Sequence, residues 1–200
     1  MSAAAGSETD RSGSHRERII AAAAQLTMRS GWSAVTMTRL AEEVGVSRQT
    51  VYNEIGSKQA LAETMVLDEL ARFLALVHRA FDEHPDDLVQ SIRVATADVL
   101  ELAHGNTLLR AIVSATHGAD TELLPLLTTH AEPLLSTAKS VIADRLAHFP
   151  LPFDEHERAA AIDVIVRVVL SHVMQPSGTP QQTADDIAWT AGRVLRVPDE

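Results

Sequence analysis

The chain has 200 residues, of which 46% are hydrophobic, 22% charged and 4% aromatic, a balance typical of an ordinary globular protein. It contains no cysteine, which excludes disulfide bonds, cysteine-based zinc sites and cysteine nucleophiles. The net charge of −10 is unevenly distributed, because residues 15–60 carry +2 and residues 61–200 carry −11, so the basic segment is the one that can meet phosphate.

The predicted elements are all helices, because apolar residues recur at helical spacing and no stretch alternates with a period of two. Residues 1–14 are small and polar without the apolar stretch of a signal peptide, and we interpret them as a disordered N-terminal arm on a cytoplasmic protein. No apolar run reaches the roughly 18 residues that a membrane span needs, so we expect no membrane association. Nine helices are predicted, over residues 15–30, 37–44, 48–55, 57–83, 86–104, 107–116, 134–148, 154–174 and 183–195.

The second and third predicted helices are short and closely connected. Thr36 and Ser47 are residue types that cap helix N-termini, and Gly45 and Gly56 are suited to end the two helices. Ala41 is small enough to let the helices pack closely. Two short helices joined by a tight turn predict a helix-turn-helix unit, although a packing hairpin in a helical bundle is the alternative for these residues taken one by one.

The third helix begins with the polar residues Arg48, Gln49 and Thr50, at the end that enters the major groove in helix-turn-helix proteins. Arg pairs with guanine, Gln pairs with adenine, and Thr contacts either a base or a thymine methyl group. Tyr52 and Lys58 lie where the DNA backbone would be gripped, and Lys58 is in the first turn of a helix whose amide groups attract phosphate. This pattern predicts a DNA-binding surface.

The whole stretch from Arg29 to Leu61 resembles the DNA-binding domain of the TetR family of transcriptional regulators. The match is dense and nearly free of gaps. The positions that carry it are Gly31, Trp32, Val35, Thr36, Leu40, Ala41, Val44, Gly45, Val46, Ser47, Thr50, Val51, Tyr52, Ile55, Ser57, Lys58 and Leu61.

The resemblance implies two sets of DNA-binding residues, namely Thr36, Tyr52 and Lys58 for phosphates, and Arg48, Gln49 and Thr50 for bases. Two positions depart from the family pattern. Ile55 stands where the family more often has Phe, and Glu54 places a carboxylate near the DNA backbone. That carboxylate either points away from DNA or accepts a hydrogen bond from a cytosine amino group.

The predicted helix over residues 154–174 is apolar nearly all round, apart from a polar stripe at Asp163, Arg167 and Ser171. Such a helix must be buried on more than one side, which suggests contact with its own core and with a second subunit. The TetR resemblance implies dimerisation through the last two helices, whereas a central core helix in a monomer is the alternative. The candidate homodimer interface is Val164, Arg167, Val168, Ser171, Ile187, Ala191 and Val194.

We therefore expect an all-α protein with a helix-turn-helix domain over residues 15–60 and a ligand-binding and dimerisation domain over residues 61–200. Aliphatic residues dominate the second domain, so we expect a lipophilic small-molecule effector. Leu and Val at helical spacing also serve as plain core. The candidate effector-binding residues are Phe73, Leu74, Val77, Ile92, Thr96, Val99, Leu123, Leu127, Leu134, Ala138, Val141, Ile142 and Leu170.

The predicted function is a ligand-responsive transcriptional repressor that binds a pseudo-palindromic site in double-stranded DNA as a dimer and is released by its effector. The alternative is a constitutive DNA-binding protein with a filled, ligandless C-terminal core. The nine histidines do not form a metal-ligand pattern, and no polar cluster resembles an active site. We expect no cofactor, no metal site and no enzymatic activity.

Overall fold

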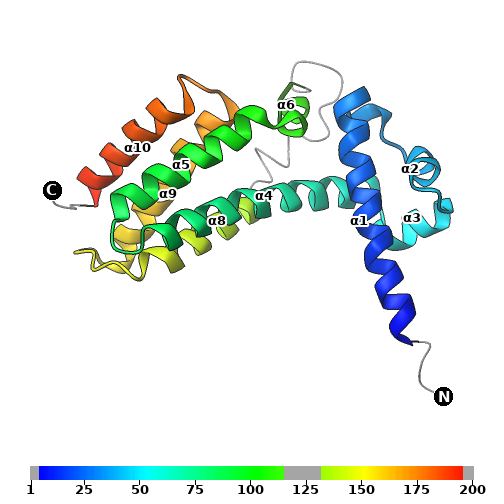
Figure 1. Cartoon of the computed structure of the whole chain (residues 1–200), viewed down its shortest axis with the longest axis horizontal. Helices are drawn as coiled ribbons and strands as arrows, with labels where there is room; N and C mark the ends of the chain where they lie inside the picture. Colours follow the sequence, from blue (N-terminus) through cyan, green and yellow to red (C-terminus); the bar gives the residue numbers. More distant parts are fainter. Residues whose placement is uncertain (1–4, 115–131, 196–200) are drawn as a thin grey trace. The chain divides into compact units, whose positions relative to one another are not determined.

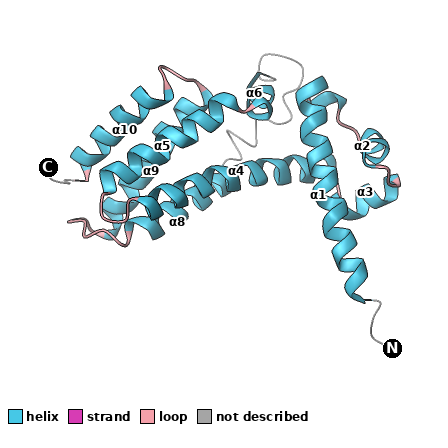
Figure 2. Cartoon of the chain, viewed as in Figure 1, coloured by secondary structure: helices cyan, strands magenta, loops and turns pink. Residues whose placement is uncertain are grey.

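The computed structural model describes residues 5–114 and 132–195. Within these ranges the chain forms nine α-helices and one 3-10 turn, with no strand, which confirms the all-α prediction (Figures 1 and 2). The described residues divide into two units, each with its own apolar core. The first unit comprises residues 5–68 and 107–114, and the second comprises residues 69–106 and 132–195.

The described helices do not include one that is both long enough and apolar enough to span a membrane.

The first unit is built on helix α1, against which the short helices pack. Its buried core is apolar and includes the side chains of Ile19, Leu26, Trp32, Leu40 and Val51. Its elements are α1 (Ala5–Ser30), η1 (Trp32–Ala34), α2 (Met37–Val44), α3 (Arg48–Ile55), the beginning of α4 (Lys58–Glu83), and α6 (Thr107–Ser114).

The extent of the first unit differs from the sequence prediction in two places. Helix α1 begins at Ala5, so residues 5–14, expected to be a disordered arm, are helical. This segment contains no proline, and Glu8 and Asp10 lie near the helix N-terminus, where acidic side chains are favourable. The unit also extends past residue 60, because Leu61 and Met65 of α4 are buried in its core.

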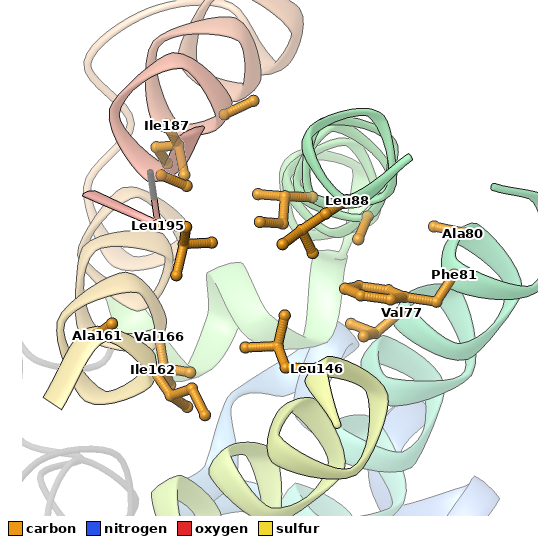
Figure 3. Close-up of a cluster of buried hydrophobic side chains, with 14 of the residues drawn as sticks. Val77, Ala80, Phe81, Leu88, Leu146, Ala161, Ile162, Val166, Ile187 and Leu195 are labelled. Carbon is orange, nitrogen blue, oxygen red and sulfur yellow. The ribbon is translucent and has the colours of Figure 1, made fainter. Parts of the chain in front are cut away.

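The second unit is a bundle formed by the remainder of α4 together with α5 (Leu88–Gly105), α8 (Glu132–Leu146), α9 (Glu155–Met174) and α10 (Pro180–Val194). Side chains from these helices converge on one apolar core, which includes Phe81, Leu88, Leu146, Ile162 and Leu195 (Figure 3). Apolar burial of this kind is the main contribution to the stability of a helical bundle.

Helix α10 packs closely on α5 over its length. A Cβ atom added at Gly192 would lie 3.3 Å from a methyl group of Val89, so the absence of a side chain permits this approach. Helix α10 begins at Pro180, three residues before the predicted start. Thr179 caps it through a hydrogen bond from the Gln182 amide, and proline is favoured at the first helical position.

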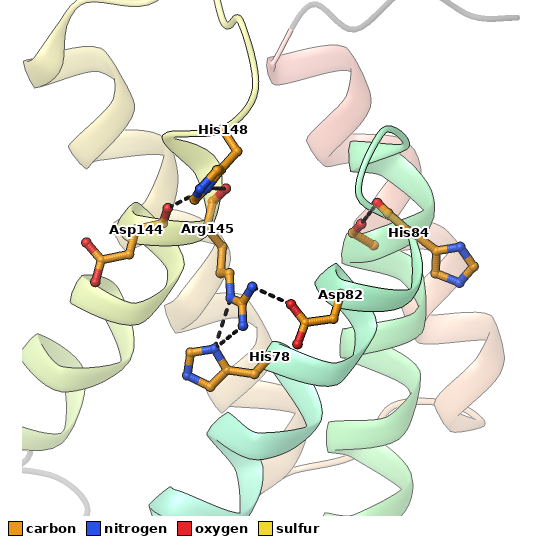
Figure 4. Close-up of polar contacts among 7 residues, drawn as sticks. His78, Asp82, His84, Asp144, Arg145 and His148 are labelled. Atoms are coloured by element: carbon orange, nitrogen blue, oxygen red, sulfur yellow. Dashed lines mark hydrogen bonds and ion pairs between the residues drawn. The ribbon is translucent and has the colours of Figure 1, made fainter.

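Two polar networks connect α8 to its neighbours in the second unit. The Arg145 guanidinium donates to Nδ1 of His78 and pairs with the Asp82 carboxylate of α4, at 2.6 Å from Nη1 to Oδ1 (Figure 4). Asp163 of α9 accepts from Arg167 at 2.8 Å and from Lys139 of α8 at 3.1 Å. The hydrogen bond from Arg167 is the larger cause, and the one from Lys139 the second, of a pKa of Asp163 that lies below its usual range. The ionised form of this carboxyl is therefore stabilised.

Candidate nucleic-acid interface

The turn between α2 and α3 is formed by a left-handed glycine. Thr36 caps α2 by accepting a hydrogen bond from the Arg39 amide at 3.2 Å, as predicted. Gly45 adopts φ 73°, and the amides of Gly45 and Val46 both donate to the Ala41 carbonyl, at 2.9 and 3.0 Å. A side chain at residue 45 would strain this turn, which is why glycine ends α2 here.

The two helices share an apolar side, against which Val46 of the turn is partly buried. Leu40, Ala41 and Val44 of α2 and Val51 of α3 are all buried in the core of the first unit. Ile55, which departs from the family pattern, is buried in the same core. The packing fixes α3 on its apolar side and leaves its polar side exposed.

Helix α3 presents its N-terminal residues to solvent, as the DNA-binding prediction requires. Ser47 caps the helix by accepting from the Thr50 amide at 3.0 Å. Arg48, Gln49 and Tyr52 are exposed. Thr50 is half-buried, and its hydroxyl lies 2.8 Å from the Ser47 hydroxyl. Thr50 therefore supports the helix start, and its methyl group together with the remaining hydrogen-bonding capacity of its hydroxyl is what it can offer to a base.

Lys58 lies at the start of α4 against Trp32 of η1. Its Nζ atom is 4.9 Å from the centroid of the Trp32 ring, a cation–π contact. The ring itself is 2% exposed and belongs to the core of the first unit. This contact holds the Lys58 ammonium beside η1, the turn that precedes α2 in the chain, where it could bind a phosphate.

Arginine side chains of α1 complete the ends of the two helices, which the sequence alone does not reveal. Arg18 donates to the carbonyl of Val44, the last residue of α2, and Arg16 donates to the Glu54 carbonyl near the end of α3. Carbonyl groups at a helix C-terminus lack partners in the helix itself, and basic side chains satisfy them. These arginines are 26 and 38 residues from their partners, and local sequence patterns give no signal over such separations.

Two of the predicted effector residues, Leu123 and Leu127, lie outside the described residues. Of the others, seven lie in or against the apolar core of the second unit, namely Phe73, Val77, Ile92, Val99, Ala138, Ile142 and Leu170. Val77, Ile92, Thr96 and Val99 are buried. The others are half-buried, namely Phe73, Leu74, Leu134, Ala138, Val141, Ile142 and Leu170.

The predicted dimer residues separate into an exposed and a buried group. Val164 is 60% exposed, Val168 39% and Val194 50%, and the polar Arg167 and Ser171 are also exposed. In contrast, two residues of α10 are buried in the chain's own core, with 6% exposure for Ile187 and 1% for Ala191. These two have almost no surface left for a partner, because that face of α10 packs on α5. Trp189 is a further large apolar residue that α10 exposes, at 65%.

Two family models match the chain, and together they cover most of it. Residues 19–65 match the model described as "Bacterial regulatory proteins, tetR family". Residues 87–193, more than half of the chain, match "Bacterial Tetracyclin repressor, C-terminal domain". The first match covers the helix-turn-helix, and the second covers most of the second unit.

Individual relatives agree with the family models. The HTH-type transcriptional regulator AlkX of Mycobacterium tuberculosis is 27% identical over 173 residues, which are 86% of this chain and 81% of that protein. The nucleoid occlusion factor SlmA of Vibrio cholerae is 33% identical over 100 residues, half of each chain. The crystal structure of the TetR family repressor AlkX from Dietzia sp. strain DQ12-45-1b, implicated in biodegradation of n-alkanes, superposes with a TM-score of 0.72 and 28% identity, covering 90% of this chain and 95% of that one.

Proposed function

This chain belongs to the TetR family of DNA-binding transcriptional regulators, and we propose that it is a repressor that binds a pseudo-palindromic operator as a homodimer and is released by a lipophilic small molecule. The observation that carries the proposal is the polar N-terminal side of α3, fixed on its apolar side by the core and exposed at Arg48, Gln49 and Tyr52. A recognition helix held in this way can meet base edges in the major groove.

The surface of the last two helices supports dimerisation. Val164, Val168, Trp189 and Val194 are large apolar side chains that are exposed on α9 and α10. Exposed apolar groups of this kind are typical of protein–protein interfaces. A dimer would bring two copies of α3 to one DNA duplex, and the preferred site would then be an inverted repeat.

The effector is proposed to be a compound with an extended aliphatic chain. Phe73, Ala138, Ile142 and Leu170 pack against the apolar core of the second unit. The Dietzia repressor, whose similarity to this protein covers 90% of the present chain, is implicated in biodegradation of n-alkanes. Release would act through α4, because residues 58–68 of this helix belong to the first unit and residues 69–83 to the second.

Selection of the purified protein against random duplex DNA, at a stated salt concentration, tests DNA reading. We expect an inverted repeat for the wild type. We expect Arg48→Ala to lose about 1–3 kcal/mol of discrimination at one base position, whereas Lys58→Ala weakens binding to all sequences alike. If both variants lost affinity uniformly, Arg48 would not be a base-reading residue.

Operator binding in the presence of n-alkanes and their oxidised derivatives of different chain lengths tests effector response. We expect release by a limited range of lengths. Ala138→Phe, which fills space beside the core, should abolish this response and preserve DNA binding, whereas Ser136→Phe, at an exposed position of the same helix, should preserve both. An operator affinity that no such compound changes would favour a constitutive DNA-binding protein with a filled core.

A further inference from the structure

We propose that Gln49 and Asn53 act as one base-reading element, in which Asn53 orients the Gln49 amide for adenine and itself donates to the acceptor edge of a neighbouring base. The inference rests on the proposed operator reading by α3. It assigns Asn53 a role in sequence preference, and it gives Gln49 a fixed orientation.

The two side chains are joined on the exposed side of α3. The Gln49 Nε2 group donates to Oδ1 of Asn53 at 2.8 Å. Residues four apart lie on the same face of a helix, one turn along its axis. Asn53 therefore lies on the same exposed face as Gln49.

The hydrogen bond decides which groups each amide can offer to DNA. A primary amide has two N–H donors and one carbonyl acceptor. Gln49 uses one N–H for Asn53 and keeps one donor and its Oε1 acceptor. This donor–acceptor pair matches adenine, which presents the N7 acceptor and the N6 amino donor in the major groove.

Asn53 offers the complementary chemistry. Its Oδ1 is occupied by Gln49, and the described residues contribute no partner to its amide nitrogen, so it presents two N–H donors. Two donors match a base edge that carries acceptors only, which is guanine with N7 and O6 in the major groove. One helical turn advances about 5.4 Å and one base pair about 3.4 Å, so the two amides would reach neighbouring base pairs.

The surroundings of Gln49 and Asn53 favour a role in contacting DNA bases over a role in packing. Both side chains are exposed, and the apolar side of α3 is anchored independently by Val51 and Ile55. Loss of the Gln49–Asn53 hydrogen bond should therefore leave the fold of the first unit unchanged. Its effect should be seen in sequence preference.

The decisive variant is Asn53→Asp, because it keeps the acceptor for Gln49 and removes both donors. The wild type, Asn53→Asp, Asn53→Ala and Gln49→Ala are each selected against random duplex DNA and then measured on single-base variants of the wild-type site. With Asn53→Asp we expect adenine preference to persist at the Gln49 position. At the neighbouring position the preference should change from guanine to cytosine, whose N4 amino group donates to a carboxylate.

With Asn53→Ala we expect discrimination to fall about tenfold at both positions, because Gln49 loses its orientation. The double variant Gln49→Ala/Asn53→Ala should lose less base discrimination than the product of the losses in the two single variants, because both residues act through one hydrogen bond. Gln59→Ala is the matched control, since Gln59 donates to Glu63 in the same i,i+4 arrangement on α4 and should leave base preference unchanged.

Two results would overturn the inference while the proposed function stands. The first is that the wild type selects an inverted repeat and Asn53→Asp selects the same bases. The second is that the losses of discrimination in Gln49→Ala and Asn53→Ala multiply in the double variant. A wild type that selects no sequence would contradict the proposed function, and this inference with it. Circular dichroism melting of each variant establishes that the loss of preference is not a loss of folded protein.

Discussion

Replacing Val164 and Trp189 together by aspartate is expected to make the protein monomeric and to lower its affinity for a two-half-site operator by about 10²–10⁴-fold. The two side chains are 60% and 65% exposed on the last two helices, so their replacement removes no packing from the chain's own core. In a dimer, each aspartate would place a carboxylate in a contact that Val164 and Trp189 make apolar, which is unfavourable because the carboxylate loses hydration. A monomer retains one recognition helix and loses the gain from binding both half-sites.

Size-exclusion chromatography with light scattering measures the oligomeric state of this variant, and electrophoretic mobility shift measures its affinity for the full operator and for a single half-site. The half-site affinity should be unchanged, because α3 is untouched. Leu67→Asp is the control, since Leu67 is an exposed apolar residue of α4 outside the last two helices. A double variant that remained dimeric would place the subunit interface elsewhere on the protein.

Trp32→Ala is expected to lower the free energy of unfolding of the first unit by about 3–5 kcal/mol. The indole ring is among the largest fully buried side chains and packs with residues of α1, α2 and α3. Its removal leaves a cavity in a small core and also removes the surface on which the Lys58 ammonium lies, 4.9 Å from the ring centroid. The variant should therefore be less stable, and it should also lose the part of its DNA affinity that comes from phosphate binding by Lys58 and is the same for all sequences.

Urea denaturation followed by circular dichroism measures this loss. Trp32→Phe is the matched comparison, because it retains an aromatic face for Lys58 and most of the buried volume, and a clearly smaller loss is expected. A loss below about 1 kcal/mol for Trp32→Ala, within the range of ordinary substitutions, would show that this core does not depend on the indole ring.

The helix-turn-helix could be predicted closely because its signals are local. Thr36 and Ser47 cap α2 and α3 as their residue types indicate, and Gly45 ends α2 in the conformation that glycine favours. Each of these interactions spans three or four residues, which is the range over which sequence patterns act. Thr179 and Pro180 are likewise local signals for the start of α10, and the predicted start at residue 183 overlooks them.

The remainder depends on tertiary contacts that no local pattern specifies. Apolar residues on α10 fit either the chain's own core or a partner, and only the packing on α5 places Ile187 and Ala191 in the former. The cation–π contact of Lys58 and the arginine contacts from α1 join residues far apart in the sequence. The sequence does not predict the helical start of α1 at Ala5, because residues 5–14 are small and polar and lack the apolar spacing that indicates a helix.

Helix α3 has only eight residues, fewer than the roughly 12–15 that an isolated helix needs to persist in water. Its order depends on Val51 and Ile55 in the core and on the cap at Ser47. Backbone amides of α3 should therefore exchange with deuterium when the core of the first unit opens, and not through an independent local transition. The fraction of molecules competent to bind DNA is then set by the stability of this core, and a substitution far from the DNA can weaken binding simply by raising the population of opened molecules.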